Sequence, residues 1–224
     1  MAAPGAPRRD PRAAFDLLLA AGLTVAGFGG YLGPVPTLAL LAAAVASFWW
    51  RGPGWRAAGL RRPASWPRAL AAGIAVGVGF QVLSLYVLEP AVAFLTTGAL
   101  PDVSVFRPLV GQPVQLAFWI TMSWTLAAFV EEMVFRGWLL TRAAELASPS
   151  PAAWVVALVV SSAFFGAAHL YQGWSGILTT GLNGAVFAGA YLLSGRNLWV
   201  PIIAHGMADT LGFTMIYLGV YPGI

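Results

Sequence analysis

Long uncharged runs of apolar residues, separated by short segments that carry arginine, constrain this chain more than any other feature. A bilayer core about 30 Å thick is crossed by about 20 apolar residues at 1.5 Å per residue. Seven runs approach this length, namely residues 13–31, 34–50, 69–88, 113–140, 152–170, 176–194 and 198–218. Because the runs are continuous rather than alternating, they favour helices over membrane strands. The pattern predicts an all-α, polytopic transmembrane helix bundle of about seven spans, with a partial span over residues 106–112 as an alternative.

The composition excludes several classes of protein. Hydrophobic residues make up 59% of the 224 residues and charged residues 9%, whereas a soluble domain averages about 25% charged residues. Cysteine is absent, so disulfides and thiolate metal sites are excluded. The pI of the sequence is about 10.0, but the arginines lie mostly between the spans. They indicate membrane topology and contact with anionic lipids rather than a nucleic-acid partner.

The distribution of arginine predicts the orientation of the spans. Arginines outside the apolar runs, or at their edges, occupy positions 8, 9, 12, 51, 56, 61, 62, 68, 107, 142 and 196. If the N-terminus is cytoplasmic, all of them except Arg107 lie on the cytoplasmic side. The positive-inside rule therefore predicts a multi-pass protein of the cell membrane with a cytoplasmic N-terminus and an external C-terminus.

Two adjacent glutamates lie inside one of the predicted spans. A carboxylate at the centre of a membrane helix costs about 2.5–3.5 kcal/mol on insertion scales and usually faces a cavity or a partner. Glu132 and Arg136 are four residues apart and can form an ion pair. Glu131 then faces another surface, because neighbours on a helix point about 100° apart. A purely structural pair beside a neutral Glu131 is the alternative. Four other acidic residues lie near span ends or in loops, where we expect water or headgroups to reach them: Asp16, Glu89, Asp102 and Glu145.

Both histidines of the chain also lie in or beside predicted spans. Phe165 precedes His169 by one helical turn, and Asp209 follows His205 by one turn on the same face. Together with the two glutamates, these residues supply a general base, its partner and hydrogen-bond donors for an oxyanion. The same side chains can bind a metal or relay protons. His169 is expected near the outer end of its span and His205 near the inner end of its own. Convergence therefore requires the helix of His169 to start late or tilt, or the loop 171–175 to dip inward.

Three motifs carry a resemblance to a known family. Glu-Glu-Met-Val-Phe-Arg at 131–136 matches Glu-Glu-x-x-x-Arg, Phe-Gly-Ala-Ala-His at 165–169 matches Phe-x-x-x-His, and His-Gly-Met-Ala-Asp at 205–209 matches His-x-x-x-Asn/Asp. In this order on hydrophobic helices, they resemble the CPBP (CAAX protease and bacteriocin-processing, Abi) family of intramembrane proteases, related to the Rce1-type CAAX prenyl endopeptidase. The resemblance divides the chain into N-terminal membrane helices with a basic cytoplasmic loop (1–112) and a protease core (113–224).

The resemblance implies a role for each motif residue. Glu131 would activate water, and His169 would orient that water or share its proton. His205 and Asp209 would stabilise the oxyanion of the tetrahedral intermediate. The supporting residues would be Glu132, Arg136 and Phe165. Asp209 departs from the Asn of many members; since an ionised Asp cannot donate a hydrogen bond, it is either neutral or orients His205.

The implied enzyme is a peptidase whose catalytic type stays open. No His-Glu-x-x-His zincin motif is present. A zinc ion held by Glu131, His169 and His205 and a metal-free mechanism both fit the residues. The expected substrate is a hydrophobic or lipidated peptide or protein within membrane lipids. A proton-coupled transporter and a non-catalytic membrane scaffold are the alternatives from other functional classes.

Overall fold

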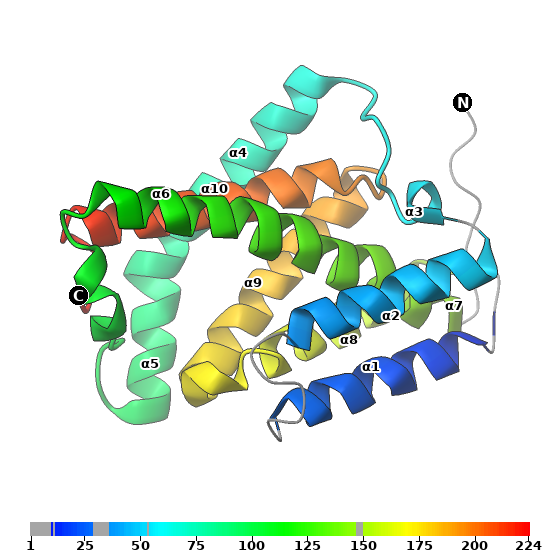
Figure 1. Cartoon of the computed structure of the whole chain (residues 1–224), viewed down its shortest axis with the longest axis horizontal. Helices are drawn as coiled ribbons and strands as arrows, with labels where there is room; N and C mark the ends of the chain where they lie inside the picture. The colour runs from blue at the N-terminus through cyan, green and yellow to red at the C-terminus, as the bar shows by residue number, and fades with distance from the viewer. Residues whose placement is uncertain (1–9, 11, 29–35, 53, 147–149) are drawn as a thin grey trace.

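The computed structural model describes residues 10, 12–28, 36–52, 54–146 and 150–224, and every regular element in these ranges is helical (Figure 1). In chain order the elements are α1 (Arg12–Phe28), α2 (Pro36–Arg51), α3 (Gly54–Ala57), α4 (Trp66–Leu83), η1 (Ser84–Leu88), α5 (Glu89–Thr97), η2 (Ser104–Leu109), α6 (Pro113–Met122), η3 (Ser123–Glu131), η4 (Met133–Leu140), α7 (Thr141–Leu146), α8 (Pro151–Ala167), η5 (Leu170–Gln172), α9 (Gly173–Leu193) and α10 (Trp199–Tyr217). The prediction of an all-α membrane bundle is confirmed.

Three continuous helices within the described ranges are long and apolar enough to cross a membrane. They cover Trp66–Thr97, Pro113–Leu146 and Leu170–Leu193, with 32, 34 and 24 residues. Thr37–Arg51 and Pro151–Ala167 are shorter apolar helices. The partial span considered over residues 106–112 is not present, because η2 is a 3₁₀ helix of only six residues.

The predicted run 69–88 continues as a helix to Thr97, nine residues beyond its expected end. A proline inside an α-helix normally clashes with the carbonyl four residues before it. Here the π-helical turn η1 (Ser84–Leu88) widens the backbone directly before Pro90. This wider turn accommodates the ring, and the helix ends at Gly98, which adopts a left-handed φ of 73°.

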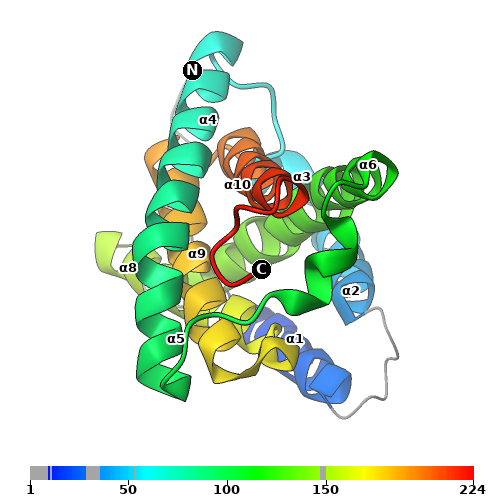
Figure 2. The ribbon, with the colours of Figure 1, turned by 90° about the vertical axis from the view of Figure 1, so that its left-hand side faces the viewer.

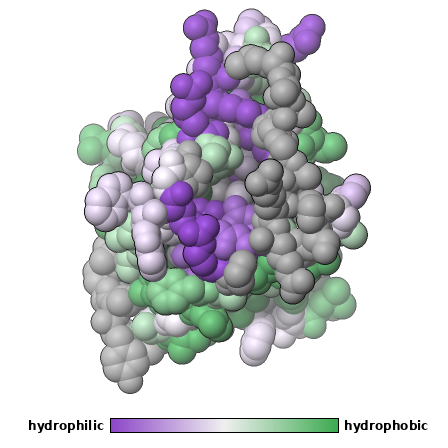
Figure 3. All heavy atoms as spheres, turned by 90° about the vertical axis from the view of Figure 1, so that its right-hand side faces the viewer, coloured by the Kyte–Doolittle hydropathy of each residue, from purple (hydrophilic) through white to green (hydrophobic). Residues whose placement is uncertain are grey.

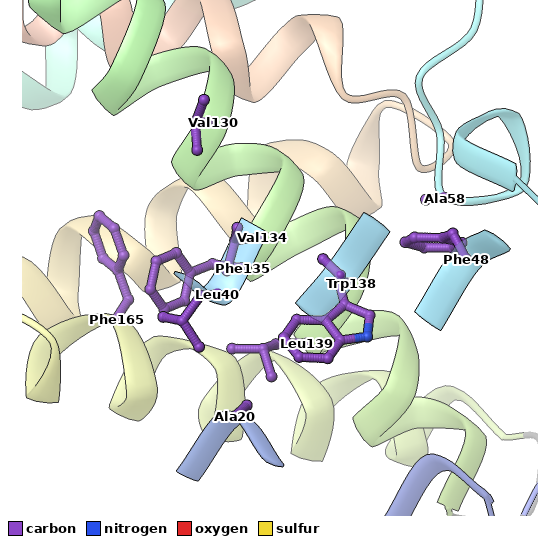
Figure 4. Packing of buried hydrophobic residues seen from close by; sticks show 11 residues of the cluster. Ala20, Leu40, Phe48, Ala58, Val130, Val134, Phe135, Trp138, Leu139 and Phe165 are labelled. Carbon is purple, nitrogen blue, oxygen red and sulfur yellow. The ribbon is translucent and has the colours of Figure 1, made fainter. Parts of the chain in front are cut away.

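Buried apolar side chains surround the helix that carries the two glutamates. All eight residues of η4 are buried, and Phe135, Trp138 and Leu139 form a cluster with Leu40 of α2 and Phe165 of α8 (Figure 4). The large rings fill the space between three helices, and such packing holds side chains in fixed rotamers. The cluster therefore fixes the rotation of this helix, which determines where Glu131 and Glu132 point.

Close approach of α4 to α10 positions the second histidine motif. A Cβ added to Gly73 would collide with the Ile203 side chain, and one added to Gly77 would collide with the Ala204 carbonyl. Small residues at a spacing of four allow membrane helices to approach this closely. On another side of α10, the Trp124 ring covers the backbone at Gly206.

A buried ionic network joins α1, α2 and α7 at one end of the bundle. Asp16 is 4% exposed; its Oδ2 lies 3.0 Å from Arg51 Nη2 and 3.1 Å from Arg142 Nε, and it accepts a 2.7 Å hydrogen bond from Ser47. The expectation that water or headgroups reach Asp16 is therefore wrong. Two guanidinium groups compensate for the cost of burying its charge.

The arginine-rich loops gather at this same end of the bundle. Arg61 Nη2 donates to the Gly195 carbonyl at 2.8 Å, so the loop after α3 lies against the α9–α10 turn. The space-filling view of this end shows hydrophilic side chains gathered over it (Figure 3). The C-terminus lies at the opposite end (Figure 1).

Candidate active site

Glu132 lies at the centre of a buried polar cluster. Its Oε1 accepts a 2.9 Å hydrogen bond from Arg136 Nη1 and lies 2.9 Å from His205 Nδ1. Arg136 Nη2 donates to the carbonyl of Gly184 at 2.9 Å. Glu132 and Arg136 are both 0% exposed. This chain of hydrogen bonds connects the long central helix to α9 and α10.

The contact between Glu132 and His205 changes the expected role of Asp209. The spacing of one helical turn predicts that Asp209 can orient His205. In the structure, Glu132 occupies the Nδ1 side of the ring, and Asp209 Oδ2 lies 3.7 Å from Nε2, beyond hydrogen-bond distance. Glu132 therefore orients the ring, and Asp209 faces its opposite nitrogen.

Aromatic rings enclose this polar cluster. The Arg136 guanidinium lies 4.5 Å from the Phe165 ring centroid and 5.5 Å from that of Phe187. The Phe187 ring also stacks on His205, with centroids 4.8 Å apart and an interplanar angle of 21°. A side chain at Gly184 would press on Phe165 and on Arg136 Nη2. Cation–π contacts and restricted water access strengthen the buried ion pair.

His169 lies two residues beyond the end of α8. Its Nδ1 is 2.8 Å from the carbonyl oxygen of Phe165, and the two rings meet edge to face at 4.9 Å. A carbonyl oxygen only accepts hydrogen bonds, so Nδ1 carries the hydrogen. In a neutral imidazole, Nε2 is then the acceptor nitrogen.

A single cavity of about 1450 Å³ is lined by the four residues predicted to be catalytic, Glu131, His169, His205 and Asp209. Glu131 is partly exposed, whereas Glu132 behind it is fully buried. From this cluster the cavity extends to Asp102 and to Tyr221, toward the end of the bundle that carries the C-terminus. Figure 2 faces this end.

The geometry shows how residues expected at different depths meet. α8 begins at Pro151 and ends at Ala167, earlier than the predicted end at residue 170. The edge-to-face contact of Phe165 with Phe135, at 4.8 Å, places the end of α8 beside the middle of the long helix. The Phe165 ring also lies 6.1 Å from His205. It therefore lies between the two histidine motifs.

Other polar residues also line the cavity, and two of them, Glu89 and Asn183, were not proposed as site residues from the sequence. Glu89, expected near water, accepts hydrogen bonds from Ser84 at 2.9 Å and from Tyr221 at 2.6 Å. Burial beside this carboxylate raises the pKa of Tyr221, because it disfavours a second negative charge. The other residue is Asn183 of α9. A lone Asn in the apolar run 176–194 was the available signal.

The candidate zinc ligands do not form a metal site in this arrangement. A zinc site takes at least three protein ligands around one point. Across the described ranges no such group of His, Asp or Glu side chains converges, and the Nδ1 atoms of His169 and His205 have other hydrogen-bond partners. Glu131, His169 and His205 share the cavity wall without forming a coordination sphere.

Comparison with protein families identifies one match. Residues 113–211 match the family described as type II CAAX prenyl endopeptidase, Rce1-like. The matched segment begins at α6, ends within α10 and contains all three motifs. Comparisons with curated proteins and with solved structures each gave no match.

Proposed function

Residues 113–211 belong to the Rce1-like family of type II CAAX prenyl endopeptidases, and from this we propose that the chain hydrolyses peptide bonds within the membrane, using water activated by Glu131. The family assignment makes the chain a CAAX-type intramembrane peptidase. One observation supports the finer proposal: Glu131, His169, His205 and Asp209 line one cavity inside an apolar bundle.

Glu131 is proposed as the general base. It lines the cavity and is partly exposed, so a water molecule can reach its carboxylate. His169 presents Nε2 as an acceptor, because its Nδ1 is bound to the Phe165 carbonyl. A water held between these two acceptors can donate one hydrogen to each, which aims an oxygen lone pair at the substrate carbonyl. The Glu131 carboxyl then returns the proton to the leaving amine.

His205 is proposed to stabilise the oxyanion that forms in this attack. Such a role needs hydrogen on Nε2, the nitrogen that faces Asp209. Since Nδ1 faces a carboxylate oxygen of Glu132, a ring with hydrogen on both nitrogens donates to Glu132 on one side and to the oxyanion on the other. Before substrate binds, the Asp209 carboxylate faces this nitrogen at 3.7 Å and balances the charge of the ring.

The proposed substrate is a lipidated or membrane-embedded peptide. The long cavity joins the polar cluster to a wall with apolar side chains such as Val105, Phe106 and Leu126. A chain of this kind can process prenylated CAAX termini, hydrophobic peptides or bacteriocin-like peptides. The transporter and scaffold alternatives predict no hydrolysis, so a cleavage assay separates them from the protease.

The test uses purified full-length protein in lipid nanodiscs and fluorogenic peptides in matched pairs, with and without a farnesyl group. We expect cleavage after dialysis against a strong chelator, with less than one tenth of an equivalent of metal bound, because the described residues offer no three-ligand site. Peptide products are identified by mass spectrometry, and metal content by elemental analysis. Loss of activity that one equivalent of zinc restores, together with loss of zinc binding in His205→Ala, would instead establish a metal site.

We also propose that the N-terminus is cytoplasmic. The loop after α3 and the α9–α10 turn lie together at the arginine-rich end, as the positive-inside rule requires of one membrane side. Reporter fusions at residue 60 should read cytoplasmic, and fusions at residue 224 should read external. A cytoplasmic C-terminus would mean an additional or missing membrane crossing.

A further inference from the structure

Asn183 is a half-buried polar residue that the proposed mechanism does not use. It lines the cavity from α9, and its Oδ1 is buried with no hydrogen-bond partner among the residues that the structure describes. Most buried polar atoms in proteins are paired, and each exception needs an explanation. With Oδ1 enclosed, Nδ2 is the polar atom that the side chain can offer to the cavity.

The directions of α9 and α10 place Asn183 relative to the cluster. The first part of α9, which includes Ser175 and Thr179, lines the cavity at the end near Tyr221. α10 ends at that same end. The two helices therefore run in opposite directions along the cavity wall. The stacked rings of Phe187 and His205 mark one common depth on both helices.

Asn183 and Asp209 lie at equal distances along their helices from these stacked rings. Asn183 lies four residues before Phe187, and Asp209 lies four residues after His205. Four residues span about 6 Å along a helix, and both Asn183 and Asp209 are displaced by this distance toward the end of the cavity near Tyr221. Asn183 and Asp209 thus face the cavity at a similar depth from neighbouring helices.

The hydrogen-bond capacities of the site show what Asn183 can supply. An ionised Glu131 or Asp209 carboxylate only accepts hydrogen bonds, and His205 already uses Nδ1 with Glu132. An oxyanion needs preorganised donors, and the carboxamide of Asn carries two N–H groups. Asn183 provides the neutral donor that Asp209 cannot provide while ionised.

We propose that Asn183 Nδ2 donates a hydrogen bond to the carbonyl oxygen of the scissile peptide bond and to the oxyanion formed from it. Asn183 is then a catalytic residue of this chain, acting with His205 from the neighbouring helix α9. The inference rests on the proposed peptidase function. It assigns to α9 a donor that the three motifs do not contain.

The test compares Asn183→Leu, which has a similar size without polar atoms, with the wild type. We expect kcat to fall about 10²-fold, the effect of removing one oxyanion donor, with KM changed less than threefold and the midpoint of thermal unfolding kept. Thr214→Val is the matched control, because the Thr214 hydroxyl donates to the Thr210 carbonyl within its own helix. Its kcat should stay within twofold of the wild type.

A second substitution asks whether a donor at the neighbouring position compensates. Adding Asp209→Asn to Asn183→Leu places an amide at a similar depth, and we expect it to restore kcat at least tenfold. If Asn183→Leu does not fold, Asn183→Ala takes its place in both comparisons. A kcat of the single variant within threefold of the wild type, or no recovery in the double variant, would overturn the role of Asn183. An inactive wild type would instead refute the peptidase function.

Discussion

Glu131→Gln should lower kcat by about 10²–10⁴, the range for a lost general base, while the midpoint of thermal unfolding stays unchanged. The amide keeps the size of the carboxylate but cannot take a proton from water. Within the described part of the chain, Glu131 has no hydrogen-bond or ion-pair partner, so the substitution breaks no contact. Peptide cleavage in nanodiscs and thermal unfolding of the same sample measure the two quantities.

Glu131→Asp is the matched control for this prediction. It keeps the base but withdraws it by one methylene, so we expect an activity between those of the wild type and Glu131→Gln. Full peptidase activity of Glu131→Gln would end the general-base assignment. The water would then have to be activated by another residue of the cavity.

Glu132→Gln should instead destabilise the protein, by about 3 kcal/mol or more. Its Oε1 is shared by Arg136 and His205 in a region closed to water. Removing one partner of a buried ion pair leaves the other charge uncompensated and typically costs 3–5 kcal/mol. We also expect lower activity, because the imidazole loses the group that orients it. Denaturant or thermal unfolding in a defined detergent provides the measurement.

A double-variant cycle tests the origin of this loss. If an uncompensated guanidinium causes it, Glu132→Gln combined with Arg136→Gln should be less destabilised than the sum of the two single variants, because no buried charge remains unpaired. Strict additivity would mean that the pair contributes nothing beyond packing. Inactive Glu132→Gln with native stability, beside active Glu131→Gln, would exchange the roles of the two glutamates.

The helices and the pairing of residues within one helix could be predicted from the sequence, because both depend on local chemistry. An apolar run of sufficient length must satisfy its backbone internally, so the run 113–140 forms a helix in the structure. The four-residue spacing likewise makes Glu132 and Arg136 neighbours in any helix. The end of the third run was missed, because the π-helical turn before Pro90 lets the helix continue.

The contacts between helices depended on tertiary structure. Glu132 and His205 are 73 positions apart, and their pairing depends on how far each helix is rotated about its axis. That rotation is determined by Phe135 and Trp138 in the core and by Trp124 against Gly206. The residue spacing within one helix does not determine these rotations.

By itself the sequence determined that this is a helical membrane protein and which charged residues must find partners inside it, because the cost of burying a charge in an apolar helix does not depend on the rest of the fold. Only the tertiary structure decided that Glu132 orients His205, that Asp209 lies farther away, and that Asn183 joins the cavity wall. The physical reason is that a hydrogen bond forms over about 3 Å, and only the packing of whole helices brings residues from different spans to that distance.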